Sequence, residues 1–187
     1  MITELLTAIS DRLAATEPNL KYIDEDWGQL DYYQESPPVK FPACLLEWQQ
    51  TSWNNQGRYV QDGVINLSVR VADMPLSGTG LRGSEAQKVK AMALWLILGN
   101  IYTALSGWRP AESIYGPLSR VSTRRIKRDD GIREFEMVFT CAVTDRTAQT
   151  QYYNIADPAV AAAQFHTVPP AQILAIELKE LQLSGGG

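Results

Sequence analysis

The sequence predicts an α+β fold in which a mainly antiparallel sheet of two β-hairpins packs against two helices, with an extended C-terminal arm. Two segments, 2–15 and 84–105, carry the apolar spacing of helices. Other segments alternate apolar and polar residues, as antiparallel strands with one solvated face do. From residue 145 the chain turns to Gln, Thr, Tyr and Pro, so we expect an α+β domain over 1–144 and a C-terminal extension over 145–187.

The N-terminal half is expected to form a helix, a short strand and a first hairpin. The helix over 2–15 has one apolar stripe, made of Ile2, Leu5, Leu6, Ile9 and Leu13. A short strand at 20–23 is followed by an acidic and aromatic stretch. Strands over 41–49 and 58–73 form the hairpin, and residues 51–57 between them are expected to be a loop because they contain turn-forming Asn and Gly.

The strand over 58–73 shows strict alternation. One face is apolar and consists of Ile65, Leu67, Val69 and Val71. The other face is polar and consists of Asn66, Ser68 and Arg70. This pattern predicts an antiparallel strand whose polar face is solvated.

A flexible glycine-containing loop over 74–83 leads into the second helix. Ser84 and Gln87 have the spacing of a capping box, and Gly107 follows the expected last turn. The run 92–98 is apolar on all sides, so we expect this helix to be covered on more than one side. The second cover is either the N-terminal helix or a neighbouring subunit, and Trp95 is expected in the core.

The second hairpin joins strands over 118–128 and 132–144 around an Asp-Asp-Gly turn. A two-residue turn places a basic and polar set beside an apolar set: Arg120, Ser122 and Arg124 beside Phe135, Met137 and Phe139. A three-residue loop with left-handed Gly131 places Val121 and Thr123 there instead. The second register is favoured, because it joins apolar residues and sets Arg124 opposite Glu136.

Composition and charge argue against several functions. The net charge of −4 argues against general nucleic-acid binding, though not against a channel through which DNA slides. We expect no signal peptide and no membrane span, because no apolar run approaches about 18 residues. Cys44 and Cys141 lie in apolar runs and are expected to be reduced core residues, with a disulfide only if their strands are neighbours.

The motif most like an enzyme's is the G-x-G-x-x-G pattern at 78–83. In dinucleotide folds the second glycine starts the helix and the third packs it on a strand, whereas here all three precede Ser84. No acid follows near residue 100 to hold a ribose. The single histidine, His166, lies in the proline-flanked tail, where a histidine-based catalytic device is not expected. We therefore expect no enzyme, no cofactor and no metal.

Charged and aromatic side chains are the candidate contact residues. The acids lack calcium-loop spacing and are expected to form a solvated acidic loop or the wall of a lumen: Asp24, Glu25, Asp26 and Asp31. The basic residues are expected in inter-strand or inter-subunit ion pairs rather than on phosphates: Arg120, Arg124, Arg125, Lys127 and Arg128. Trp53, in a polar hairpin tip, is expected to contact another chain.

The C-terminal extension contains one alternating segment, 173–183, with Ile176 and Leu178 on one face. An isolated strand has unpaired backbone groups, so we expect this arm to dock on a neighbour or on its own domain. The candidate interface residues are therefore Trp53, Arg124, Glu136, Ile176 and Leu178.

Two short motifs resemble a known family. They are Trp27-Gly28-Gln29-Leu30-Asp31 and Lys40-Phe41-Pro42-Ala43-Cys44-Leu45-Leu46. They resemble the opening "G-Q-L-D … F-P-A" of the tail terminator proteins of long-tailed bacteriophages, including the Mu-like family. The strand over 63–72 and the helix after Ser84 also fall where this family has them, and the likeness covers about residues 1–144.

The resemblance implies a structural virion protein: a homohexameric ring that caps the tail tube, ends its polymerisation and joins the tail to the head. The implied partners are further copies of the chain, the tail tube protein and a head-completion or neck protein. DNA would pass the lumen without specific binding, and no membrane is involved. The implied location is the virion tail or neck, assembled in the host cytoplasm. The alternatives are another ring-forming connector or neck protein and, more remotely, a nucleotide-binding enzyme that uses the 78–83 loop.

Overall fold

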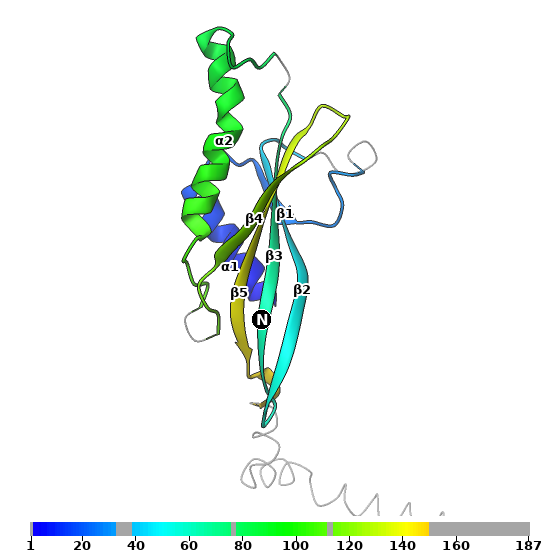
Figure 1. Cartoon of the computed structure of the whole chain (residues 1–187), viewed down its shortest axis with the longest axis vertical. Coiled ribbons are helices and arrows are strands. Elements are labelled where there is room, and N and C mark those ends of the chain that lie inside the picture. Colours follow the sequence, from blue (N-terminus) through cyan, green and yellow to red (C-terminus); the bar gives the residue numbers. More distant parts are fainter. Residues whose placement is uncertain (1, 33–38, 76–77, 112–113, 150–187) are drawn as a thin grey trace, which may run out of the picture. The chain divides into compact units, whose positions relative to one another are not determined.

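The computed structural model describes residues 2–32, 39–75, 78–111 and 114–149 (Figure 1). They form the predicted α+β fold, with the elements α1 (Ile2–Thr16), β1 (Tyr22–Glu25), β2 (Ala43–Gly57), β3 (Val60–Asp73), α2 (Glu85–Leu105), β4 (Ser119–Ile126) and β5 (Arg133–Asp145). A compact unit made of Met1–Asn55 and Gln61–Asp145 contains both helices and nearly all of the sheet. Almost all of the expected C-terminal extension, including Ile176, Leu178 and His166, lies outside the described residues.

The sheet has five strands in the order β1-β2-β3-β5-β4, so β1 and β4 are its two edges (Figure 1). β5 is antiparallel to both β3 and β4, whereas β1 is parallel to β2. β2 and β3 are neighbours joined by a two-residue connection, which links only antiparallel strands. The sheet is therefore mainly antiparallel, as the sequence predicts.

The first hairpin is longer than predicted. Residues 51–57 were expected to be a loop, but β2 continues through them to Gly57. The chain reverses at Arg58 and Tyr59, both of which have the positive φ angles (53° and 62°) of a tight two-residue hairpin turn. Trp53 therefore lies within a strand, where it is half-buried against the core, and its predicted place in a hairpin tip is wrong.

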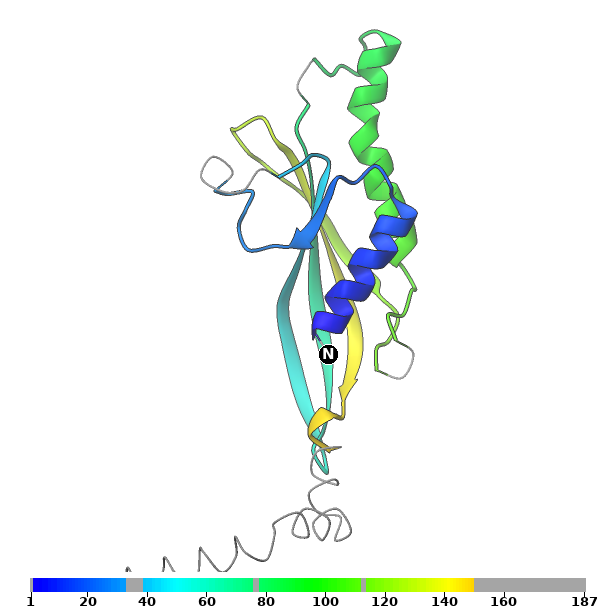
Figure 2. The ribbon, with the colours of Figure 1, turned by 180° about the vertical axis from the view of Figure 1, so that it is seen from behind.

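One main core lies between the sheet and the two helices, which cover the same face (Figure 2). From α1 it takes Leu5, Ile9 and Leu13, while Leu6 is half-buried and Ile2 is exposed. From β3 and β5 it takes the alternating residues Ile65, Leu67, Val69, Val71, Phe135, Met137, Phe139, Cys141 and Val143. The predicted apolar stripes thus form the interior of one layered α/β core.

Both cysteines are free and buried in this core, as expected. Burial raises the pKa of the Cys44 thiol to about 12 and that of Cys141 to about 11. The two thiols are therefore protonated at neutral pH and serve as small apolar core residues.

The ends of α2 follow the predicted signals. The Ser84 backbone N–H donates to Gln87 Oε1 at 2.9 Å, which is one half of the capping box. At the other end Gly107 has φ +75°, a left-handed conformation that glycine adopts without strain. No helix in the described ranges is both long and apolar enough to cross a membrane.

The second hairpin has the favoured register. Gly131 is left-handed (φ +82°), Thr123 lies opposite Met137, and Arg124 lies opposite Glu136. A bulge between Arg120 and Ser122 then shifts the register along the rest of β4. Val121 is the extra residue and is 64% exposed, so its predicted place beside the aromatic residues is wrong.

Candidate assembly surfaces

A buried ion network covers part of the sheet face away from the helices. Arg70 of β3 contacts Asp26 at 2.6 Å and Glu134 at 2.5 Å. Arg128 reaches the same Glu134 at 3.0 Å, and also contacts Asp31 at 3.0 Å. Glu134 is fully buried, although its side chain is a carboxylic acid.

This network changes the interpretation of one predicted acidic residue, Asp26. The Asp26 side chain is 3% exposed, so Asp26 is neither a solvated loop acid nor part of a lumen wall. Burial alone would lower the pKa of Arg70, but hydrogen bonds and charge from Glu134 and Asp26 raise it above its ordinary value. Arg70 is therefore charged at neutral pH, and it holds the segment that contains Asp26 and Asp31 on the sheet.

The predicted pair between Arg124 and Glu136 is confirmed. The Arg124 guanidinium donates to Glu136, and the Ser68 hydroxyl donates to the same carboxylate at 2.8 Å. Burial alone would raise the pKa of Glu136, but these two hydrogen bonds outweigh burial and lower it. Ser68, predicted to be solvated, is buried by this pairing.

An apolar and basic surface lies along the β4 edge. The outer side of α2 exposes Val89 (67%), Met92 (46%) and Leu96 (65%), which are spaced by three and four residues. Trp95, expected in the core, is instead 52% exposed, and its ring meets Phe135 edge-on at 4.8 Å. We call the set Val89, Met92, Trp95, Leu96, Arg120 and Arg125 the β4–α2 surface.

α1 provides only part of the second cover predicted for α2. Arg12 Nε donates to the carbonyl of Ala104 at 2.5 Å, and Asn100 Nδ2 donates to Glu17 Oε2 at 2.6 Å. All four of these residues lie in α1, just after it, or in the C-terminal part of α2. The exposed apolar stripe, Val89 to Leu96, lies before these contacts along α2, and among the described residues it has no second cover of the kind its sequence predicts.

β4 itself is exposed along nearly its whole length, as befits an edge strand. Arg120 stacks over the Tyr102 ring at 3.7 Å, which places a cation beside α2. Arg125 lines a cavity of about 210 Å³ together with Trp95 and Phe135. The edge thus combines positive charge with exposed aromatic and aliphatic side chains.

The glycine loop has a structural explanation. A Cβ atom on Gly83 would lie 2.1 Å from Gln87 Oε1, the atom that caps α2. The third glycine of the motif therefore makes room for the helix cap. Thr79, Gly80 and Leu81 line the 210 Å³ cavity next to Trp95, on the β4–α2 surface.

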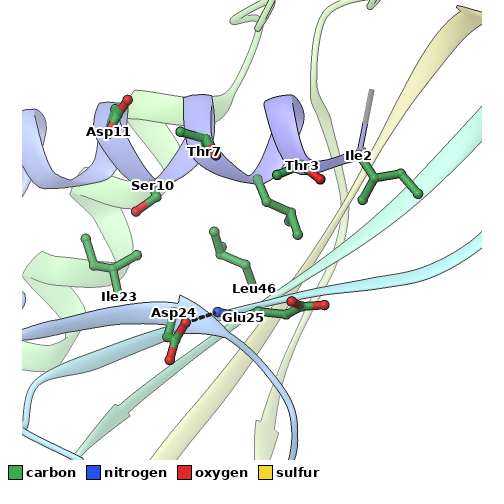
Figure 3. Close-up of a pocket in the computed structure, with 10 residues that line it drawn as sticks. Ile2, Thr3, Thr7, Ser10, Asp11, Ile23, Asp24, Glu25 and Leu46 are labelled. Carbon is green, nitrogen blue, oxygen red and sulfur yellow. Dashed lines mark hydrogen bonds between the residues drawn. The ribbon is translucent and has the colours of Figure 1, made fainter. Parts of the chain in front are cut away.

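A second surface lies at the opposite edge of the sheet. An open groove of about 370 Å³ runs between α1 and β1 (Figure 3). Its apolar lining consists of Ile2, Leu6, Ile23 and Leu46, and its acids are Asp11, Asp24 and Glu25. We call these seven residues the β1–α1 surface.

The acids of this second surface are exposed, and Asp24 accepts two hydrogen bonds from its neighbours. The Tyr22 hydroxyl donates to Asp24 Oδ2 at 2.7 Å, and this hydrogen bond raises the pKa of Tyr22. The Glu25 backbone N–H donates to Asp24 Oδ1 at 2.9 Å, as Figure 3 shows. Asp24 and Glu25 therefore form an exposed acidic edge, unlike buried Asp26. In the described ranges no group of three or more His, Cys, Asp and Glu residues could hold a metal ion.

The sequence predicted a second cover for the apolar helix but not which of its residues would remain exposed. Residues 89, 92 and 96 are spaced for one helix face, but the buried stripe runs through Ala91, Leu94 and Leu98. A helix that is apolar on all sides predicts that both of its faces are covered, but it does not predict which face stays exposed within one subunit. The groove at β1 had no sequence signal, because α1 and β1 form it from residues on two elements.

Comparisons with known proteins found one kind of similarity. No family model and no curated protein sequence matches the chain. Among solved structures, it is similar to a chain of the virion of a native gene transfer agent (GTA) particle. The identity is 14% and the TM-score is 0.44, and the match covers 75% of this chain and 95% of that chain.

Proposed function

We propose that this chain is a structural virion protein of phage type, and that its copies form a closed ring in the role of a tail terminator. In this role the ring caps the tail tube, ends its polymerisation and joins the tail to the head. The observation that carries the proposal is the β4–α2 surface, where α2 exposes a stripe of apolar side chains and the β4 edge is open and basic. Such a surface is typical of a subunit that buries it on assembly.

The apolar stripe is large enough to contribute to association. Fully burying an aliphatic side chain of this size contributes roughly 1.5–3 kcal/mol. Because Val89, Met92 and Leu96 are about half exposed, each would contribute about 1 kcal/mol on full burial. With Trp95 the sum is about 4–5 kcal/mol per contact, repeated at every contact of a ring.

The two surfaces favour a ring over a two-fold dimer. The β4–α2 surface is basic, whereas the β1–α1 surface is acidic, and each has an apolar part. Complementary and unlike surfaces on one subunit form head-to-tail contacts, which close into a ring when the rotation allows. The motifs at 27–31 and 40–46 support the tail terminator among ring-forming proteins.

Native mass spectrometry tests the ring. The wild-type chain should give a species of six subunits, about 125 kDa from the 20.8 kDa chain. The double variant Met92→Glu/Leu96→Glu should melt like the wild type and lose this species. Tyr32→Glu, which alters an exposed aromatic residue outside both surfaces, is the matched control and should retain it.

A polymerisation assay tests the terminator role. Tail tubes of the same phage, grown from purified tube protein, should stop lengthening when the chain is added, and electron microscopy should show a ring at one tube end. If the ring requires the tube, the six-subunit species should appear here instead. A chain that is monomeric both alone and with tubes would overturn the proposal. A ring that binds tubes without stopping their growth would indicate a neighbouring connector protein.

A further inference from the structure

We infer that β4 of one copy lies antiparallel along β1 of the next copy, so that the basic edge of one sheet meets the acidic edge of the next. This inference rests on the proposed ring and specifies which parts of two neighbouring copies touch. The occupant of each edge is thus a second copy of this chain.

Both edges present backbone groups for a further strand. β1 pairs only with β2, and β4 pairs only with β5, within the described residues. An edge strand carries unpaired N–H and C=O groups on its outer side, and adding a strand from another chain satisfies them.

The directions of the strands decide how the edges would pair. β1 is parallel to β2, and each later neighbour in the order β2-β3-β5-β4 reverses direction. β4 therefore runs antiparallel to β1 within one subunit. Consider a neighbouring copy that extends the sheet and keeps its helices on the same side. Its β4 then has the same direction as β4 of the first copy, so it meets β1 of the first copy as an antiparallel pair. This arrangement has the slightly more stable hydrogen-bond pattern.

The lengths of the two strands agree. The bulge at Val121 interrupts β4, and the regular part after it runs from Ser122 to Ile126. β1 spans the four residues Tyr22–Glu25, so the regular part of β4 can match its whole length.

The charges of these two short segments are opposite. Ser122–Ile126 contains Arg124 and Arg125, and both are exposed. Tyr22–Glu25 contains Asp24 and Glu25, and both are exposed. Matching β1 over its whole length allows a register in which Arg124 lies opposite Asp24. In this register Glu25 lies opposite Thr123, and Arg125 is its diagonal neighbour on the same face, within reach of a long side chain. Antiparallel pairing would therefore place two cations along two carboxylates. A β4 edge meeting another β4 edge would instead juxtapose arginines, which like-charge repulsion disfavours.

The apolar parts lie on the same side of the sheet as each other. Both helices cover one face (Figure 2), so the groove beside β1 and the cavity that Trp95 and Arg125 line beside β4 are on that face. A continued sheet would bring the half-exposed Trp95 of one copy toward the α1 groove of the next. Salt pairing and apolar burial would then occur at the same contact.

Charge exchange at Arg125 and Glu25 tests the pairing. These residues are preferred to Arg124 because Arg124 also holds Glu136 within the subunit. Arg125→Glu alone and Glu25→Lys alone should each weaken association about tenfold or more, because each then faces a like charge at every contact. Arg109→Glu and Asp129→Lys make the same charge changes at exposed positions outside the two edges, and they should associate like the wild type.

The decisive measurement is recovery of association. The chain that carries both Arg125→Glu and Glu25→Lys should regain the six-subunit species, because every contact again joins opposite charges. An equimolar mixture of the two single variants should also regain it by alternating around the ring, and native mass spectrometry should show three copies of each. Each variant's thermal melt, measured alongside, should match that of the wild type.

The outcomes separate this inference from the proposed function. If the wild type forms the ring, alone or on tubes, and the two reversals do not weaken it, the edge pairing is wrong and the ring stands. If the reversals weaken it but neither the double variant nor the mixture recovers, positions 25 and 125 are not neighbours across the contact and the pairing is likewise wrong. If the wild type forms no ring under either condition, the proposed function and the pairing fall together.

Discussion

Replacing Glu134 with Gln should destabilise the fold without disturbing the assembly surfaces. Glu134 is fully buried on the face of the sheet away from the helices, and it accepts hydrogen bonds from both Arg70 and Arg128. Glutamine has nearly the same shape but no charge, and its amide group would direct N–H donors at one of these guanidinium groups. The variant therefore leaves buried positive charge less compensated.

The expected loss follows from what remains around each arginine. Removing one partner of a buried ion pair typically costs about 3–5 kcal/mol. Because Arg70 keeps Asp26 and Arg128 keeps Asp31 and Asp130, the lower end applies, about 3 kcal/mol. For a domain of this size, this corresponds to a melting temperature lower by about 10 °C.

Urea and thermal unfolding followed by circular dichroism measure this loss directly. Asp129→Asn, which neutralises an exposed acid in the neighbouring turn, is the control and should change stability by less than about 0.5 kcal/mol. A loss below about 1 kcal/mol for Glu134→Gln would refute the reasoning. It would mean that Arg70 and Arg128 are sufficiently compensated by their other partners when Glu134 is neutral.

Three further predictions concern pH, the C-terminal arm and the glycine loop. Although burial alone would raise it, the pKa of Glu136 is held below its ordinary 4.5 by Arg124 and Ser68, so its ionised form stabilises the fold above that pH and this contribution is lost as pH falls. Glu136→Gln should therefore make the free energy of unfolding less dependent on pH below about 4.5. Urea unfolding between pH 3 and 7 measures this, and a variant whose free energy of unfolding changes with pH as steeply as that of the wild type would contradict it. Deleting residues 150–187 should leave a cooperatively melting chain with weaker self-association by sedimentation, and failure to fold would show that the arm belongs to the core. Calorimetry should detect no NAD or ATP binding at 78–83, whereas a dissociation constant below about 100 µM, roughly −5.5 kcal/mol, would reverse this interpretation.

Features governed by local chemistry could be predicted from the sequence. The α1 helix ends one residue beyond its predicted limit, and the Ser84 and Gln87 cap lies where its spacing indicates. The left-handed Gly131 and the pair between Arg124 and Glu136 also follow from a few neighbouring residues and the two-residue period of strands. The α+β class results from these local patterns acting together.

Features that depend on distant segments were missed. Residues 51–57 have a loop-like composition, yet they form strand because β3 provides a partner along the whole hairpin. The alternation of β3 correctly assigned Ser68 and Arg70 to the polar face. It did not show that Asp26, 44 residues earlier, would fold over Arg70 and bury its own carboxylate there.

The sequence predicted that α2 would have an apolar surface in need of a cover, but it did not predict which residues form that surface. The all-round apolar run of α2 indicated a missing cover, which the structure locates on the side of Val89 and Leu96. Trp95 was assigned to the core because tryptophan is large and apolar, but its position on the helix leaves half of it exposed. Which side of an apolar helix remains open is decided by where α1 packs, and no local pattern records this.

The bulge at Val121 bears on unwanted pairing of the β4 edge with other chains. A long regular edge strand would offer a template to any extended chain, including partly folded copies during synthesis. The extra residue breaks the ladder near the start of β4, and the arginines after it repel other β4 edges. Shortening the chain by deleting Val121 would straighten this edge, and the expected consequence is a protein that precipitates when concentrated although its core is unchanged.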